Sequence, residues 1–262
     1  MKGRKAFMLE VLYEKKGHLA FIRLNRPDSL NAINKAMAKE LIKIWIDFRD
    51  DKNLWVAILS GEGKSFCGGA DLKEMERGQW QFRQSLLYGD ERIGPSNYEV
   101  WKPIVAAVHG HVYGAGLLLA LESDIIVAAE DALFGIPETR VNVPFLTAPF
   151  IYNYLPRNVA NEMMYTSKPI GAKRAYDVSV VNRIVSLGQI LATAKEIADD
   201  ICLCGPLANQ ASKELALRCR HMDSQSAIAL IEHIAPAVWN SEDSVEAKKA
   251  FLEKRSPSWE QK

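Results

Sequence analysis

Hydrophobic positions along the chain follow two periods, and each period predicts one type of element. Apolar and polar residues alternate over residues 8–13 and 19–24, on either side of Lys15-Lys16-Gly17, which predicts a β-hairpin. Spacings of three and four residues over 33–48 predict one helix. Short apolar runs bounded by glycine or polar residues predict buried strands at 56–59, 104–108, 125–128 and 133–134.

The second half of the chain is richer in helical patterns. Residues 76–100 are polar and mixed, and we expect helix there with a break at 89–95. Amphipathic helices are predicted at 189–204 and 207–220, on either side of Gly205-Pro206, and a last helix at 243–254. Because strands alternate with helices, we expect an α/β fold with parallel strand pairing. The helix-rich C-terminal part resembles a separate layer or an oligomerisation element.

Charge and cysteine content narrow the range of partners. The chain has 262 residues with 33 basic and 32 acidic side chains, a net charge of +1, which provides no basic field for nucleic acid. Its four cysteines show neither zinc nor redox spacing, so we expect no metal site and a reducing compartment. We find no secretory pattern and no apolar run long enough to span a membrane. We therefore expect a cytoplasmic protein without nucleic-acid or membrane partners.

Two glycine-rich turns follow predicted strands. In Gly68-Gly69-Ala70, and again in GHVYGAG (110–116), small residues let a ligand approach bare backbone N–H groups. The second turn opens a helix, whose first N–H groups are unpaired and carry the positive end of the dipole. A plain loop and tight strand–helix packing are the alternatives for each turn taken alone. Together, two such turns suggest two N–H groups aimed at one oxygen, as acyl chemistry requires.

The order of these motifs resembles that of the crotonase family, the enoyl-CoA hydratase/isomerase superfamily. The matching stretches include LNRPDSLNAINKAM (24–37), SFCGGADLKEM (65–75), KPIVAAVHGHVYGAG (102–116), SDIIVAAEDALFGIPETRV (123–141) and SEDSVEAKKAFLEKRSPSW (241–259). The resemblance implies a spiral of repeated ββα units over residues 1–200. It implies C-terminal helices over 201–262 that build trimers, often paired into hexamers. It also implies a coenzyme A thioester as substrate and no tightly bound cofactor.

The same resemblance assigns catalytic groups. The family's two oxyanion donors correspond to the backbone N–H groups of Ala70 and Ala115, and one of two hydratase glutamates corresponds to Glu138. The position of the other glutamate holds Leu118. A single carboxylate beside an oxyanion hole can remove a proton from one carbon of an enolate and return it to another. We therefore expect double-bond isomerisation or a hydratase-like reaction. Decarboxylation, retro-aldol cleavage and a weakly catalytic acyl-CoA-binding protein are the alternatives.

Substrate contacts are implied in the same way. Coenzyme A contacts correspond to Arg26, Ala32, Gly68, Gly69, Ala70 and Lys73, and, from a neighbouring subunit, to Phe251 and Lys254. Tyr113 and Gly114, at the second turn, are candidates for the acyl pocket. Lysines meet phosphates as point charges, although a lysine taken alone is more often a solvated surface residue.

Other titratable residues near the two turns have plainer interpretations. Glu122 is either a substitute for the missing acid or a structural carboxylate paired with an Arg or Lys. His109 and His111 have no further metal ligands nearby in sequence, so we interpret them as ordinary strand-end histidines. We expect Asp71 to cap, or to form a salt bridge with, the helix that follows it. We also expect apolar neighbours to raise the pKa of Glu138.

Overall fold

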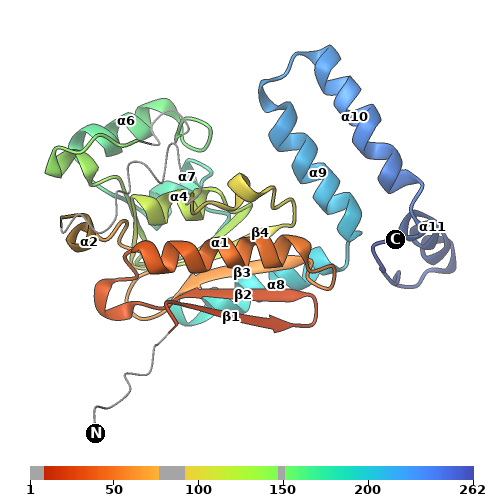
Figure 1. Ribbon diagram of the computed structural model, residues 1–262, viewed down its shortest axis with the longest axis horizontal. Coiled ribbons are helices and arrows are strands. Elements are labelled where there is room, and N and C mark those ends of the chain that lie inside the picture. The colour runs from red at the N-terminus through yellow and green to blue at the C-terminus, as the bar shows by residue number, and fades with distance from the viewer. Residues whose placement is uncertain (1–8, 77–91, 147–150) are drawn as a thin grey trace, which may run out of the picture.

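A large parallel sheet forms the body of the molecule. The structure is a computed structural model that describes residues 9–76, 92–146 and 151–262 (Figure 1). Six strands follow the order β1-β2-β3-β4-β6-β9. They are β1 Val11–Lys16, β2 Leu19–Leu24, β3 Val56–Gly61, β4 Ile104–Val108, β6 Ile125–Ala129 and β9 Arg183–Val185. β1 is antiparallel to β2 and every other neighbouring pair is parallel, which confirms the α/β fold class.

The N-terminal hairpin turns later than the sequence pattern predicted. Its register pairs Lys16 with Leu19 and so leaves only Gly17 and His18 in the turn. Gly17 has φ +55°, a left-handed conformation that glycine adopts without steric cost. The strand predicted at 8–13 continues to Lys16 in the structure. The prediction ended it too early because the lysines at 15 and 16 are typical of turns and of edge strands alike.

Helices cover both faces of this sheet, α1 (Lys35–Asp50) on one and α8 (Ile190–Cys202) on the other (Figure 1). Alternate residues of β3 enter two separate hydrophobic clusters: Ala57 and Leu59 pack on the α1 side, and Val56 and Ile58 pack on the α8 side. A strand buried on both faces needs an unbroken apolar run, which explains the pattern at 56–59. The helix predicted at 33–48 is confirmed as α1.

A smaller sheet, in the order β5-β7-β8, leads into the segments that form the candidate site. Its strands are β5 His111–Tyr113, β7 Leu133–Gly135 and β8 Ile170–Gly171. β5 follows β4 and β7 follows β6 after a few residues, and β5 leads directly into the helix α4 (Ala115–Leu121). This strand–turn–strand–helix path is the repeated ββα unit that the resemblance implied. Sequence periodicity missed β5, because three residues are too few to show an alternation.

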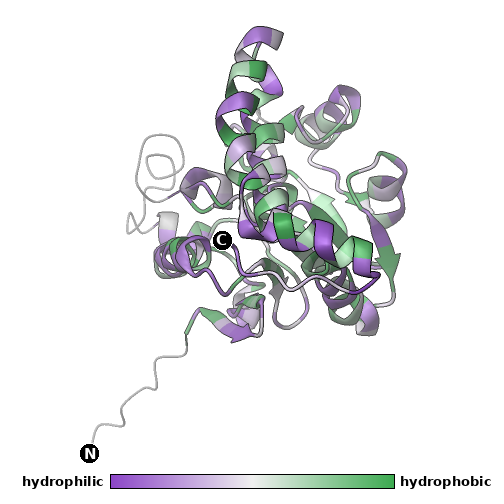
Figure 2. Ribbon diagram, turned by 90° about the vertical axis from the view of Figure 1, so that its right-hand side faces the viewer, coloured by the Kyte–Doolittle hydropathy of each residue, from purple (hydrophilic) through white to green (hydrophobic). Residues whose placement is uncertain are grey.

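The remaining helices include a C-terminal group to one side of the core (Figure 1). They are α2 Leu72–Glu76, α6 Arg157–Thr166, α7 Ala172–Asp177, α9 Pro206–Arg218, α10 Ser224–Trp239 and α11 Glu242–Glu253. The patterns predicted α8, α9 and α11 to within a few residues but missed α10. Hydrophobic residues are interspersed with hydrophilic ones along the helices that rise highest in Figure 2. The apolar side chains of α10 are largely uncovered, since Ile228 is 54% and Trp239 66% exposed, so no single buried stripe marks it.

Three further expectations bear on the overall organisation. The helix predicted over 76–100 falls largely outside the described residues; within them, Pro95–Tyr98 forms a short 3₁₀ helix. Among the helices of the described ranges, none combines the length and apolar character that a bilayer crossing requires. The division into a core over 1–200 and a C-terminal region over 201–262 stays a prediction.

Candidate active site

The second glycine turn presents a bare N–H group at the start of α4. Gly114 precedes the helix with φ +50°, and its N–H donates to Gly135 O at 3.0 Å. Ala115 is the first helical residue, so its N–H has no partner inside the helix. No other residue in the described part of the chain accepts a hydrogen bond from it. The positive end of the helix therefore stays open to a ligand.

The first glycine turn presents a second bare N–H group. Ile33 forms a parallel bridge with Ala70: Ile33 N–H donates to Gly69 O at 2.7 Å, and Asp71 N–H donates to Ile33 O at 2.9 Å. Both hydrogen bonds use the neighbours of Ala70, so the N–H of Ala70 itself points to the opposite side. Within 9–76, 92–146 and 151–262, nothing accepts a hydrogen bond from it.

The two turns lie against each other. A β-carbon on Gly69 would lie 3.3 Å from Tyr113 O and 3.9 Å from Ala115 N. A β-carbon on Gly116 would overlap Cys67 Cβ at 2.5 Å. Tyr113 N–H also donates to Cys67 O at 3.0 Å, which joins the two segments directly. Small residues thus let the chain bring two unpartnered donors together, the arrangement that an oxyanion hole requires.

Glu138 lies beside the same turn. It begins a short 3₁₀ helix, Glu138–Val141, shortly after β7. A β-carbon on Gly114 would lie 2.5 Å from Glu138 Oε1, so the carboxylate occupies the space that this glycine leaves. Its Oε2 is buried and has no hydrogen-bond partner among the described residues. Burial raises the pKa of Glu138, opposed in part by a hydrogen bond to its own backbone, and this direction confirms the expectation.

Leu118 lies on α4 and Glu122 at its C-terminal cap. They are the two residues of 115–122 that are half-buried, while the others are buried. Glu122 Oε2 accepts hydrogen bonds from Ser96 Oγ at 2.6 Å and from Ser96 N–H at 3.3 Å. Burial raises the pKa of Glu122, while the Ser96 hydrogen bonds and the charge of Lys213 act in the opposite direction. The expected ion pair with an Arg or Lys is absent among the described residues, because Lys213 pairs with Asp124 instead.

Arg26 holds the loop before α1 against the first turn. Its guanidinium donates to Ala32 O and, at 2.9 Å, to Asp71 Oδ2. Asp71 also accepts hydrogen bonds from the N–H groups of Lys73 and Glu74, which confirms that it caps α2. Its salt bridge, however, is to Arg26 and not to the helix that follows. The clamp brings together segments that the resemblance assigned to coenzyme A, although their contact with substrate stays a prediction.

Asn31 is an organising residue of this loop that sequence reasoning missed. It is fully buried and has φ +54°. Its side chain accepts a hydrogen bond from Arg26 N–H and donates to Glu62 O and Ser65 O, each at 2.8 Å. Asparagine tolerates the left-handed region and hydrogen-bonds readily to nearby backbone, so an Asn in a short break between two elements was the available signal.

The residues assigned to a neighbouring subunit lie far from this site within one chain. Phe251, which is 83% exposed, and Lys254 belong to the end of α11, on the side of the molecule opposite α2 (Figure 1). Lys73 is exposed at the start of α2. The roles of these three residues in substrate binding stay predictions.

The histidines near the second turn hydrogen-bond to protein groups. His109 Nε2 lies 3.0 Å from Gly63 O, and His111 Nδ1 lies 3.0 Å from Ser65 Oγ. The Tyr113 ring meets the His111 ring edge-on at 4.8 Å, and its place in an acyl pocket stays a prediction. In the ranges that the structure describes, no group of three or more metal-ligating side chains occurs.

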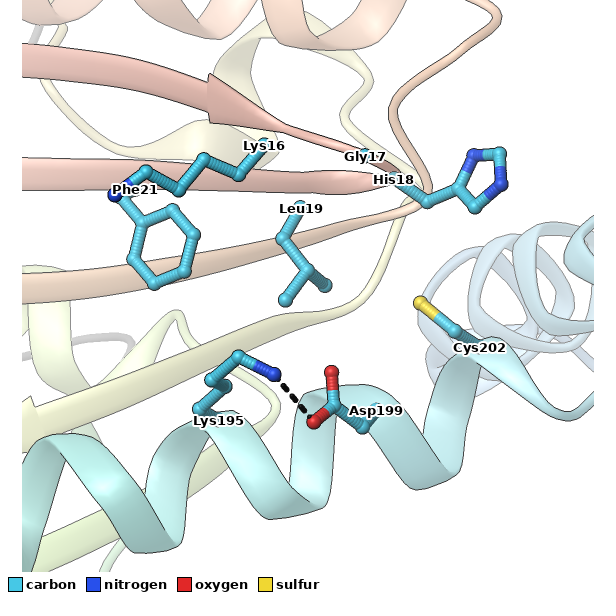
Figure 3. A pocket seen from close by; sticks show the side chains of 8 residues that line it. All are labelled: Lys16, Gly17, His18, Leu19, Phe21, Lys195, Asp199 and Cys202. Carbon is cyan, nitrogen blue, oxygen red and sulfur yellow. Dashed lines mark hydrogen bonds and ion pairs between the residues drawn. The ribbon is translucent and has the colours of Figure 1, made fainter.

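A cavity of about 240 Å³ lies away from these groups, between the β1–β2 hairpin and α8 (Figure 3). It is lined by Lys16, Gly17, His18, Leu19, Phe21, Lys195, Asp199 and Cys202. Lys195 and Asp199 pair with each other at 2.6 Å across one turn of the helix. Since it contains none of the predicted site residues, we do not assign acyl-CoA chemistry to it.

Known proteins resemble this chain in sequence and in structure. A model of the enoyl-CoA hydratase/isomerase family matches residues 14–262. Carnitinyl-CoA dehydratase from Shigella flexneri is 35% identical over 263 residues, covering 94% of this chain and 96% of that protein. The crystal structure of enoyl-CoA hydratase from Mycobacterium tuberculosis H37Rv matches with a TM-score of 0.89 and 33% identity, covering 97% of this chain and 100% of that chain. An enoyl-CoA hydratase/isomerase from Mycobacterium paratuberculosis matches with a TM-score of 0.88 and 31% identity, covering 97% and 99%. The chain therefore belongs to the enoyl-CoA hydratase/isomerase family.

Proposed function

We propose that the protein carries an acyl-CoA thioester through an enolate, with Glu138 as its single acid/base. The observation that carries this proposal is the position of the Glu138 carboxylate. Its Oε2 is buried and has no partner among the described residues, and its Oε1 lies against Gly114, directly before the bare N–H of Ala115. The Ala70 N–H lies across from it on the neighbouring turn. One thioester oxygen between the two donors would place the α-carbon near the carboxylate.

The chemistry follows from this placement. Glu138 takes a proton from a carbon next to the thioester or its conjugated double bond, and the two N–H groups stabilise the negative charge that develops on oxygen. Return of the same proton to a different carbon moves the double bond. Leu118 cannot hold a water molecule as a second carboxylate would, which favours isomerisation over direct hydration.

The resemblance to carnitinyl-CoA dehydratase supports a second outcome of the same first step. If the substrate carries a hydroxyl on the β-carbon, Glu138 can remove the α-proton and deliver it to that hydroxyl, so that the bond from the β-carbon to oxygen breaks and water leaves. Both reactions use one proton carrier and one oxyanion hole, and they differ only in the acyl group that is bound.

The site also favours an oligomer. Phe251 and Lys254 match family positions that contact coenzyme A from a neighbouring subunit. They belong to the end of α11, which in one chain lies to the side of the core, away from α4 (Figure 1). Large apolar side chains of α10 and α11 are exposed, among them Trp239 and Phe251. We infer that copies of this chain assemble into a trimer or hexamer through these helices, with no tightly bound cofactor.

A panel of thioesters tests the proposed reaction. We expect turnover of 3-enoyl-CoA or 3-hydroxyacyl-CoA compounds, carnitinyl-CoA included, and none of malonyl-type compounds. In Glu138→Ala and Glu138→Gln, turnover should fall by about 10²- to 10⁴-fold while coenzyme A affinity, measured by calorimetry, is unchanged. Wild-type rates in both variants would show that another group moves the proton, and turnover of malonyl-type thioesters alone would point to a decarboxylase.

A further inference from the structure

The Glu138 carboxylate receives no hydrogen bond from any other residue of the described chain. Its Oε2 has no partner there, and the hydrogen bond that opposes the rise in its pKa comes from its own backbone. Gly114 leaves space for Oε1, but the Gly114 N–H donates to Gly135 O instead. The direction of the carboxylate therefore depends on how the backbone that carries it is held.

Apolar packing holds only the first part of this backbone segment. Ile136 is fully buried, but none of the four residues of the 3₁₀ helix Glu138–Val141 is buried, and Val141 is 55% exposed. A hydrogen bond within the segment, from Val143 N–H to Glu138 O at 3.0 Å, keeps its shape but does not join it to another element. A tie to the rest of the molecule must therefore come from polar contacts.

Thr139, the residue after Glu138, makes that tie. Its Oγ1 donates to Met164 O at 2.6 Å and lies 2.7 Å from Ser167 Oγ. Because a carbonyl can only accept and the threonine hydroxyl has one proton, that proton goes to Met164 O, and Ser167 donates the second bond. The threonine side chain is branched at its β-carbon and adopts few rotamers, so the two bonds also fix the backbone at this position.

The other side of the tie is anchored in the core. Met164 is 5% exposed and lies in the last turn of α6, whose carbonyl groups have no partner inside the helix. Ser167 follows α6 directly and has φ +52°. The Thr139 hydroxyl thus caps a carbonyl that the helix leaves unpaired, on a residue that packs in the main hydrophobic cluster.

We propose that Thr139 is a positioning residue for the reaction: its hydroxyl holds the segment that carries Glu138, so that the carboxylate stays against Gly114 and beside the two bare N–H groups. Thr139 acts only through Glu138 and touches no reacting atom. This inference rests on the proposed function for the role of Glu138 as the acid/base.

Thr139→Val tests the tie, because it removes the hydroxyl and keeps the branched shape. Thr166→Val is the matched control, since Thr166 Oγ1 donates to Glu162 O at the same 2.6 Å within α6, without contacting the Glu138 segment. Both kcat and KM are measured with the thioester that the wild-type protein turns over fastest. Because a shift of about 1 Å at a reacting group can lower rates by about 10²-fold, we expect kcat to fall by about 10-fold or more in Thr139→Val. In Thr166→Val it should stay at the wild-type level, and KM should change little in both.

The pH profile separates positioning from a general loss of stability. The pH dependence of kcat/KM reports the pKa of the acid/base in the free protein, and burial raises the pKa of Glu138 above its usual value of 4.5. A carboxylate that moves toward water loses this rise. The pKa from the profile should therefore move down toward 4.5 in Thr139→Val and stay unchanged in Thr166→Val. Thr139→Ser, which keeps the hydroxyl, should restore most of kcat and the wild-type profile.

Equal kcat in Thr139→Val and Thr166→Val, or a fall in kcat without a change in the pH profile, would overturn the inference. So would a rate in Thr139→Ser as low as in Thr139→Val. If Thr139→Val does not fold, Ser167→Ala takes its place, because it removes the second bond and keeps the bond to Met164 O. A smaller fall in kcat with the same direction of pKa change is then expected, and wild-type values would contradict the inference. Failure of the proposed function appears separately, as wild-type turnover by Glu138→Gln.

Discussion

One glutamate lies near each end of α4, and the two differ in the groups that surround their carboxylates. Glu138 lies against Gly114 at the N-terminal end and Glu122 lies at the C-terminal end, and burial raises the pKa of both. At the N-terminal end, the N–H groups of Ala70 and Ala115 lie nearby without hydrogen-bond partners among the described residues. At the second end, Ser96 occupies one carboxylate oxygen. A raised pKa alone therefore does not distinguish the two carboxylates; we propose Glu138 as the acid/base because it lies next to bare backbone donors.

We expect the largest effect on kcat from a substitution at Gly114, where the backbone packs most closely against the Glu138 carboxylate. Gly114→Ala adds a β-carbon at φ +50° and 2.5 Å from Glu138 Oε1, which must displace the carboxylate. Because a shift of about 1 Å at a reacting group can lower rates by about 10²-fold, we expect a fall in kcat of that order. Steady-state kinetics measures it. Gly17→Ala is the matched control, because Gly17 has a similar φ of +55° and an added β-carbon there would meet no atom within 4 Å. Equal rates in both variants would show that the Gly114 contact does not position Glu138.

A second change makes the two-carboxylate arrangement that this chain lacks. Leu118→Glu places an acid one helical turn after Gly114, where it can share a water molecule with Glu138. We expect hydration of 2-enoyl-CoA to rise by about 10-fold relative to Leu118→Gln, which adds polarity without an acid. Product analysis by chromatography distinguishes the hydroxyacyl product from an isomer. Equal hydration by the two variants would mean that Leu118 does not determine the reaction.

A smaller effect is expected at the clamp that joins the two predicted coenzyme A segments. Arg26→Lys removes a guanidinium that bonds Ala32 O and Asp71 together, and an ammonium cannot reproduce both bonds in the same geometry. The free energy of unfolding should fall by about 1 kcal/mol, measured by chemical denaturation. KM should rise more than kcat falls, because Arg26 holds the predicted coenzyme A segments together and acts on the reacting atoms only through Asp71 and its neighbour Ala70. A loss confined to kcat would place Arg26 in the chemistry instead.

The smallest effect concerns pH and stability. The folded pKa of Glu138 lies above its usual value of 4.5, so the folded state binds this proton more tightly than the unfolded state. Its contribution to stability is present below pH 4.5 and is lost as pH rises through the folded pKa. Glu138→Gln should therefore be more stable than the wild-type protein at neutral pH, and the difference should shrink as pH falls toward 4.5. Thermal unfolding at several pH values measures this, and a constant difference would contradict the raised pKa.

Local sequence patterns predicted the backbone N–H groups of the two glycine turns, but not the contacts between segments distant in sequence. Glycines that permit close backbone approach leave a mark in the sequence, so Ala70 and Ala115 were identifiable, and motif order pointed to Glu138. The contact between Gly114 and Glu138 and the bonds of Asn31 join segments distant in sequence, and no periodicity encodes them. The tie between Ser96 and Glu122 escaped for the same reason. The helix α10 escaped because its apolar surface is left uncovered in one chain.

The central claim is that Glu138 alone moves the proton, and isotope exchange tests it most directly. A saturated acyl-CoA incubated with the protein in deuterium oxide can exchange its α-protons without completing a reaction, and nuclear magnetic resonance follows the loss of the proton signal. We predict exchange with the wild-type protein and with Glu122→Gln, and a loss of about 10²-fold or more with Glu138→Gln. Exchange at the wild-type rate in Glu138→Gln, or its loss in Glu122→Gln instead, would contradict the account.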